Sequence, residues 1–492
     1  GYSVGIGFIV TPFFLQYLGP ESYGLVGFFA LMQAWMSILD AGISPTLGRE
    51  TAVMRGQPGN AVVFWELLKS FEAIFFVLGL LAAFGIFIGS DWFAENWINL
   101  KDLNVHTAKI CIQIMGALVA LRWLAALYRS GINGFEDQVW LNGYNIIIIT
   151  VKFGGALALV AYISNSIIHF FAYQLGIGIL ELVVLALRFY SHLFRPDIAS
   201  YFSFNLSAVK PVPPFGLRVA CTSGVWTLLT QTYKLLLSSM LLLEEFVSLS
   251  FISLASNGVI LASNPISQSL KPRLTYLFSK GGHKELILLY RNMMQLSAVI
   301  AISICALFIT IGDKILIAWT GNRVLAEWGY LPLVFFSVGN AFLAMSSYSY
   351  YLQAACGTLS LHIKYSTAIA IIQVPLIFYA AVNYGVLGVG IAWSLFVGFS
   401  FVLWTPYVHK FLFPGIRISM LRQDIFPVAI PIILAALILV ALGVEFDESR
   451  IALLIYAAVI LFTFLFFGLL GSRLFRQWLK SFLGKISWKF YD

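Results

Sequence analysis

Charged residues are scarce in this sequence. Asp, Glu, Lys and Arg together make up 11% of its 492 residues, whereas an ordinary soluble protein has about 25%. Apolar residues make up 60%, and the mean hydropathy is +0.89. This composition excludes a cytosolic enzyme and a disordered chain. Continuous apolar runs approach the roughly 20 residues that span a bilayer as a helix, and the clearest are 71–89, 141–163, 167–187 and 453–470. They predict an all-α polytopic membrane protein.

The sequence also lacks the motifs of soluble enzymes. It has no phosphate-binding Gly-rich loop ending in Lys-Ser or Lys-Thr, no His-Glu-x-x-His and no Gly-x-Ser-x-Gly. Its four cysteines have no paired spacing, which favours packing roles over disulfides or metal ligands. The longest hydrophilic loops, 191–214 and 271–292, are too short for an ATPase domain. We therefore expect no enzyme activity and no cofactor. Any transport would use an H+ or Na+ gradient, the membrane potential or the substrate's own gradient.

The apolar pattern predicts about fourteen transmembrane helices. Twelve form two six-helix bundles, residues 1–190 and 215–412, joined by a cytoplasmic linker at 191–214. An additional helical pair at 413–471 and a basic cytoplasmic tail at 472–492 follow. The predicted spans cover roughly residues 3–18, 24–47, 71–90, 106–128, 141–163, 167–188, 217–241, 248–269, 293–312, 330–355, 366–383, 387–408, 427–443 and 451–470.

Lys and Arg are distributed unevenly between the two sets of loops. Of the 30, 22 lie on the side that includes the C-terminus, three lie within spans, and five lie on the opposite side: Lys101, Lys109, Lys314, Arg323 and Arg450. Because cytoplasmic loops are enriched in Lys and Arg, both termini are predicted to be cytoplasmic. Topology and anionic lipid headgroups explain these basic loops, so nucleic acid is not an expected partner. Gly1 begins within an apolar stretch and is not Met, so we expect a few residues to precede it.

The two halves of the sequence match at an offset of 224 residues. Residues 18–21 and 242–245 each lead through a span to an arginine, Arg49 in the first half and Arg273 in the second. At the same offset, polar residues of the second helix fall on polar residues of the eighth: Gln33, Asp40 and Ser44 match Asn257, Asn264 and Gln268. With Ser37, the first set lies on one face of a helix. Six helices per unit predict repeats related by a pseudo-two-fold axis along the membrane normal.

Three cations, Arg122, Lys152 and Lys234, lie within predicted spans. Such a group costs at least about 2.5–3.5 kcal/mol near the bilayer centre on insertion scales, so it normally faces protein or water and marks a pathway. Arg129 lies on the same helix face as Arg122, and Lys234 shares a face with Gln231. Together they can line a cationic cavity between the two halves. In the alternative interpretation, the arginines serve the interface and topology, and the lysines pair with acids for structural reasons.

Acids within the predicted spans are fewer. Asp40 lies on the polar stripe of the second helix, and Glu181 lies in the sixth helix. Each can be a counter-ion to the cations or a site of H+ or Na+ coupling. The sequence leaves both roles open.

Several short motifs have a recognisable order. The first half contains Leu18-Gly-Pro-Glu-Ser-Tyr-Gly24, then Leu39-Asp-Ala-Gly-Ile43 and Arg49. The second half contains Gln231-Thr-Tyr-Lys-Leu-Leu236, Pro265-Ile-Ser-Gln268 and Pro272-Arg-Leu274 before Lys280-Gly-Gly282. They resemble the motifs of the Wzx-type bacterial polysaccharide flippases, members of the multidrug/oligosaccharidyl-lipid/polysaccharide exporter superfamily. That family commonly has Asp before the Lys of the seventh helix, where this sequence has Tyr233. Fourteen helices also resemble the lipid II flippase branch.

The resemblance implies a flippase of the bacterial inner membrane. It would move undecaprenyl-pyrophosphate-linked oligosaccharide to the outer leaflet by alternating access, for the assembly of O-antigen, lipopolysaccharide or exopolysaccharide. Polysaccharide polymerase and chain-length machinery are possible partners. The alternatives are a lipid II-type flippase or an ion-coupled drug or organic-cation antiporter of the same superfamily. The expected pyrophosphate and sugar contacts are Arg49, Arg122, Arg129, Lys152, Lys234, Gln33, Gln231, Asn257, Asn264 and Gln268, with Asp40 and Glu181 as coupling or counter-ion groups.

Overall fold

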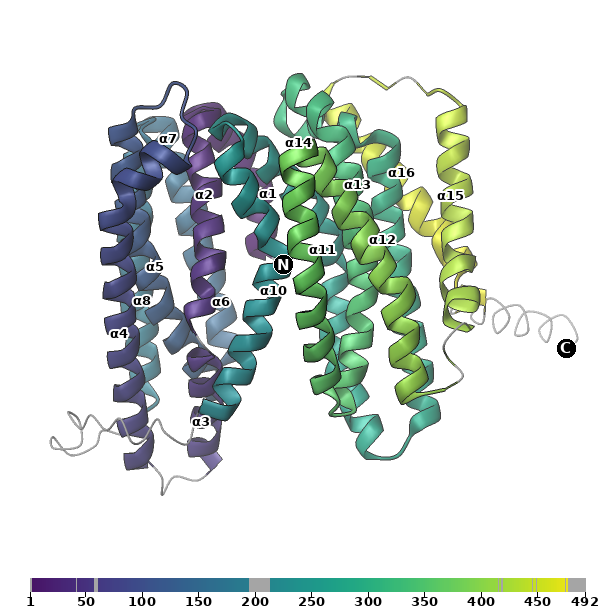
Figure 1. Cartoon of the computed structure of the whole chain (residues 1–492), viewed down its shortest axis with the longest axis horizontal. Helices are drawn as coiled ribbons and strands as arrows, with labels where there is room; N and C mark the ends of the chain where they lie inside the picture. Colours follow the sequence, from purple (N-terminus) through teal and green to yellow (C-terminus); the bar gives the residue numbers. More distant parts are fainter. Residues whose placement is uncertain are drawn as a thin grey trace, which may run out of the picture. The chain divides into compact units, whose positions relative to one another are not determined.

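The computed structural model describes residues 2–40, 42–56, 61–193, 213–414, 416, 419–444, 446–447, 449–473 and 475–476, which are almost entirely helical (Figure 1). In chain order, the elements are α1 (Tyr2–Leu18), α2 (Pro20–Met36), η1 (Ser37–Asp40), α3 (Ile43–Gly56), α4 (Ala61–Trp92), η3 (Phe93–Trp97), α5 (Val105–Gly134), α6 (Gln138–Thr150), η4 (Val151–Gly155), α7 (Ala156–Tyr162), α8 (Ile167–Ser191), α10 (Pro213–Met240), α11 (Leu243–Ser279), α12 (His283–Thr320), α13 (Arg323–Ala355), α14 (Leu359–Leu412), η6 (Leu421–Ile425), α15 (Phe426–Ala441) and α16 (Arg450–Gly471).

The all-α membrane class is confirmed. Ten helices of the described part are long and apolar enough to cross a membrane, so the chain is a multi-pass membrane protein. Each of the fourteen predicted spans falls on helical residues. The two spans predicted at 366–383 and 387–408 both lie in α14, on either side of Gly385, whose φ of 57° interrupts the helical backbone.

The second predicted span is wrong as one continuous helix. α2 ends at Met36 and α3 begins at Ile43, with the 3₁₀ turn η1 between them. Gly42 has a φ of 74°, in the left-handed region that favours glycine. Asp40 Oδ1 then accepts hydrogen bonds from the Ser44 backbone N–H (3.0 Å) and hydroxyl (2.9 Å), next to the start of α3. The polar stripe from Gln33 to Ser44 is therefore divided between two helices.

Residue contacts divide the chain into two compact units, Gly1–Val247 and Ser248–Asp492. In the first unit, α5 contacts α2, α3, α4, α6 and α8, and so holds a central place. The sequence assigns α10 to the second six-helix bundle, but α10 contacts α2, η1 and α3 of the first unit. In the second unit, α12 contacts α13, α15 and α16, and α13 contacts α14.

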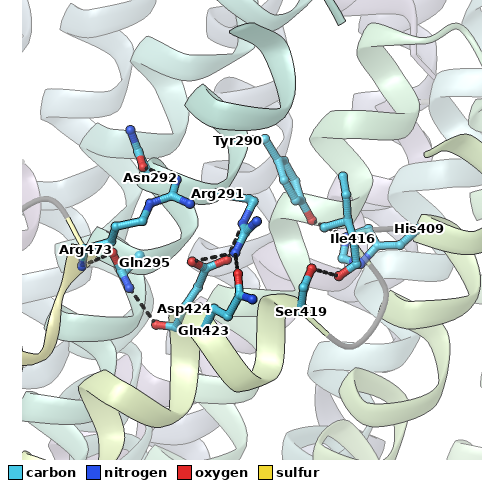
Figure 2. Close-up of polar contacts among 10 residues, drawn as sticks. All are labelled: Tyr290, Arg291, Asn292, Gln295, His409, Ile416, Ser419, Gln423, Asp424 and Arg473. Carbon is cyan, nitrogen blue, oxygen red and sulfur yellow. Dashed lines mark hydrogen bonds and ion pairs between the residues drawn. The ribbon is translucent and has the colours of Figure 1, made fainter. Parts of the chain in front are cut away.

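A polar cluster fastens the C-terminal helices α15 and α16 to α12 (Figure 2). Arg291 of α12 donates from Nε to Asp424 Oδ2 at 2.6 Å, and the Asp424 side chain is only 1% exposed. Gln295, one turn further along α12, donates to the Asp424 carbonyl (3.0 Å) and accepts from the backbone N–H of Arg473 (2.8 Å). Arg473 also donates to Asn292 Oδ1 at 2.9 Å. The start of α15 and the chain just after α16 are thus tied to the same two turns of α12.

Substitution of Asp424 by Asn should therefore destabilise the second unit. Breaking one partner of a buried ion pair costs about 3–5 kcal/mol, because the other charge stays buried and unpaired. We expect a clear fall in the melting temperature of the detergent-purified protein, followed by tryptophan fluorescence. Asp313→Asn is the matched control, since Asp313 is half-exposed and pairs only loosely with the adjacent Lys314 at 3.5 Å. Equal melting temperatures for Asp424→Asn and the control would contradict the proposed fastening role.

Candidate functional site

The candidate site in the first unit is centred on the carboxylate of Glu181. Glu181 lies on α8, and its side chain is 9% exposed. Arg129 of α5 donates from Nη2 to Glu181 Oε1 at 2.6 Å, and Lys152 of η4 forms an ion pair with Glu181 Oε2. Each carboxylate oxygen therefore has its own cation. A buried carboxylate is retained in an apolar unit only when partners of this kind replace its lost hydration.

Arg122 is the third cation of this site. It lies two turns before Arg129 on α5, close enough to Glu181 to interact with it electrostatically. Its Nη1 donates to Gln33 Oε1 of α2, and its guanidinium lies 5.0 Å from the centroid of the Phe29 ring. Three cations surround one carboxylate, so the site keeps two positive charges without a partner acid.

Lys152 reaches Glu181 because its helix is interrupted. Residues Val151–Gly155 form the π-helical turn η4, which leaves backbone carbonyls without their usual partners. Tyr173 of α8 donates its hydroxyl to the Val151 carbonyl (2.7 Å), and Gln174 donates to the Lys152 carbonyl (3.1 Å). A Cβ on Gly155 would lie 1.9 Å from the Tyr173 hydroxyl oxygen, so a larger residue there would displace Tyr173 from this contact. The same helix that carries Glu181 thus stabilises the turn that presents Lys152.

Two amides complete the polar surroundings of the arginines. Asn145 of α6 accepts a hydrogen bond from Arg129. The Nε2 group of Gln33 is buried and has no hydrogen-bond partner among the described residues. Gln33 therefore orients Arg122 through its oxygen and keeps its two N–H donors unused.

The other predicted residues lie outside this cluster. Lys234 of α10 is half-buried, and its ammonium lies 5.8 Å from the centroid of the adjacent Tyr233 ring. It forms no ion pair with any acid of the described residues. Gln231 contacts the neighbouring Thr230 hydroxyl at 3.5 Å. Arg49 is exposed and pairs with Glu50 at 3.3 Å.

Predicted residues of the second unit form a neutral polar contact. Asn340 of α13 donates to Asn257 Oδ1 at 3.4 Å and accepts from the Trp393 indole N–H at 3.2 Å. Asn264 is half-buried on the same helix as Asn257. The side chain of Gln268 lies outside the described residues.

Sequence reasoning missed the residues that hold the cluster together. Asn145, Tyr173 and Gln174 are polar positions on amphipathic helices, and nothing in their spacing marks them. The Gly154-Gly155 pair after Lys152 was the available signal, because glycine pairs are sites of helix bending and close approach.

Comparisons with solved structures identify the fold. A lipid II flippase MurJ in an inward closed conformation has a TM-score of 0.72 at 15% identity, covering 94% of this chain and 96% of that one. An inward-facing multidrug resistance MATE family transporter of the MOP superfamily has a TM-score of 0.66 at 14% identity, covering 82% and 93%. A MOP superfamily transporter from Pyrococcus furiosus has a TM-score of 0.54 at 14% identity, covering 83% and 94%. The chain has the fold of the MOP superfamily transporters. No protein-family model and no curated protein matches the sequence.

The ion pairs of Glu181 can be tested by a double-mutant cycle. Glu181→Gln leaves Lys152 and Arg129 without their acid, and we expect a loss of about 3–5 kcal/mol in unfolding free energy. Adding Lys152→Met to this variant removes one unpaired charge and should restore part of the stability, which gives a positive coupling energy. Stability is measured by thermal unfolding in detergent. Glu50→Gln is the control, because the exposed Arg49–Glu50 pair contributes about 0–1 kcal/mol. Additive effects of the Glu181 and Lys152 substitutions would show that the ion pair contributes nothing.

Proposed function

We propose that this protein is a flippase that moves a polyprenyl-pyrophosphate-linked oligosaccharide from the cytoplasmic to the outer leaflet of the bacterial inner membrane. Both termini would be cytoplasmic, and the product would serve cell-surface polysaccharide assembly by polymerase and chain-length machinery. The observation that carries the proposal is the group of three cations around Glu181 within membrane-spanning helices. Two unbalanced positive charges at this depth favour an anionic ligand.

The chemistry of the cations suits a pyrophosphate. The planar guanidinium groups of Arg122 and Arg129 can each donate two parallel hydrogen bonds to phosphate oxygens, and Lys152 supplies a compact charge. Glu181 occupies these donors while no ligand is bound. An entering pyrophosphate would replace Glu181 as their partner, so that the cations exchange one anion for another. The N–H donors of Gln33 suit phosphate or sugar oxygens.

Energetics also favour outward movement of such a substrate. A membrane potential that is negative inside contributes about 2.3 kcal/mol per charge per 100 mV to moving negative charge outward. The fold supports a substrate of this class, since the MurJ neighbour is described as a lipid II flippase. That this chain acts on the same class of substrate is part of the proposal.

An ion-coupled drug or organic-cation antiporter is the second candidate. The MATE neighbour is described as a multidrug resistance transporter. A cation substrate would require an acidic or aromatic cavity, and Glu181 is already paired with two cations. A lipid II-type flippase would use the same pyrophosphate chemistry and differs only in the sugar.

Ligand-induced thermal stabilisation separates these candidates. A ligand that binds only the folded state raises the melting temperature. At a ligand concentration of 100 times Kd, the gain in folding stability is about 2.7 kcal/mol. We expect a saturable rise with undecaprenyl pyrophosphate and none with rhodamine 6G. Lys152→Gln should weaken the pyrophosphate effect about tenfold or more, as expected for a charge-assisted contact. The control Lys109→Gln should leave it unchanged, because Lys109 lies on α5 but pairs with the exposed Asp91. A rise with the dye alone would favour drug export.

Lys234 offers a cleaner test of binding. Its ammonium has no acid partner among the described residues, so Lys234→Gln removes a charge without breaking an ion pair. Without ligand, we expect the unfolding free energy of this variant to stay within about 0.5 kcal/mol of wild type, and its melting temperature to change little. The pyrophosphate-induced rise should nevertheless be smaller. An unchanged ligand response would remove Lys234 from the proposed anion site.

A further inference from the structure

The acids that the sequence offered for ion coupling are already occupied. Glu181 pairs with Arg129 and Lys152, and Asp40 accepts two hydrogen bonds from Ser44. A proton-coupling group must gain and lose its proton as the protein changes conformation, which requires a buried titratable group without a charged partner.

His409 of α14 meets that description in the second unit. Its side chain and that of Tyr290 of α12 are both 0% exposed. His409 Nε2 and the Tyr290 hydroxyl are 2.8 Å apart, and the two rings meet edge to face with centroids separated by 5.5 Å (Figure 2). His409 Nδ1 is buried and has no hydrogen-bond partner among the described residues.

The orphan nitrogen is one of several unpartnered polar atoms in this core. Thr405, one turn before His409 on α14, is 0% exposed, and its hydroxyl also has no partner among the described residues. The amide oxygen of Gln353 on α13, whose side chain is 0% exposed, likewise has no hydrogen-bond partner among the described residues. Each such atom costs about 1–3 kcal/mol when it is left without a partner. Several of them in one apolar core point to a ligand that the core takes up in another state.

We propose that His409 is a proton-binding site that couples transport to an H+ gradient. In the tautomer in which Nε2–H donates to the Tyr290 oxygen, the lone pair of Nδ1 accepts the proton. An N–H bond forms there, the imidazole gains one positive charge, and water both delivers and removes the proton. The protonated Nδ1 then has the Thr405 hydroxyl, one helical turn away, as an acceptor.

The charges around His409 make proton binding depend on conformation. The titratable or charged groups of this core and its edge are Tyr290 and Arg291 of α12, Tyr348 and Tyr351 of α13, and Arg422 and Asp424 of η6. The tyrosines are neutral, and Asp424 is held by Arg291 at 2.6 Å. A protonated His409 would therefore be an uncompensated buried cation in this conformation. The site releases its proton here and binds one where the core opens to water, and that difference in affinity is what couples the two processes.

The test uses the full-length protein in proteoliposomes that contain a pH-sensitive dye. Undecaprenyl pyrophosphate is the transported probe, so this arm rests on the proposed function. We expect wild-type flipping to move protons and to change about tenfold in rate over the pH range in which a histidine titrates. His409→Gln should lose both properties while it still flips the lipid down its own gradient. His106→Gln, which alters an exposed histidine at the start of α5, should behave as wild type.

A second measurement needs no transported substrate. The chain has six histidines, and labelled imidazole carbons give one resonance each in nanodiscs, with His409 identified by its loss in His409→Gln. We expect the His409 resonance to change with pH between about 4 and 8, a range that extends well below neutral because the buried core disfavours the imidazolium. Tyr290→Phe, which keeps the ring but removes the hydroxyl, should shift that change. A resonance that stays constant over this range overturns the inference, even if the lipid is flipped. Lipid flipping without proton movement also overturns it and leaves the proposed function intact. Failure of wild type to flip the lipid contradicts the proposed function alone, because the resonance still tests His409.

Discussion

The arrangement of the first unit depends on one buried carboxylate shared between cations. An isolated cation in a membrane-spanning helix is costly. Arg129 and Lys152 share Glu181 as their acid, and the nearby Arg122 is held by Gln33. That requirement shapes the backbone as well. The π-helical turn of η4 brings Lys152 to Glu181, and hydrogen bonds from α8 stabilise the turn. α8 thus supplies both the acid and the support for its partner.

The second unit contains a buried ion pair with a different consequence. Arg291 and Asp424 balance each other one to one, and the surrounding amides join that pair to α16. No charge is left over, so the pair fixes helices and offers no attraction to a ligand. The Glu181 cluster has an excess of two positive charges. Charge balance, more than burial, separates a structural ion pair from a candidate binding site.

The sequence was informative where a pattern depends on many residues. Apolar runs of bilayer length predicted where the long helices lie, with the second span as the exception, because burial in lipid is a property of a whole segment. Arg122, Lys152 and Glu181 could be singled out, since charge within an apolar run needs a partner. Their pairing could not be predicted, because it depends on a local change of helical pitch at η4. The break at Gly42 was missed for a similar reason, since one left-handed residue leaves the hydropathy pattern unchanged.

Asp424 and His409 show a further limit of sequence reasoning. Both lie near helix ends, where a polar residue normally contacts water or headgroups, and so neither position stood out. Their burial results from tertiary contacts with α12, of His409 with Tyr290 and of Asp424 with Arg291, between residues more than a hundred positions apart.

The predicted repeat and the observed sites together suggest a division of labour. The first half carries an excess of cations and a polar helix that is broken between α2 and α3. The corresponding helix of the second half, α11, is continuous and places Asn257 in a neutral contact with Asn340. If the cations bind the charged part of a substrate, duplicating them in the second half would strengthen retention and oppose release, because a transported ligand must leave as readily as it enters. Neutral amides in the second half can contact sugar hydroxyls without that penalty. If the proposed function holds, the two halves differ both in the backbone of this helix and in the charge of its polar residues, and that asymmetry would favour release of the substrate after it has crossed.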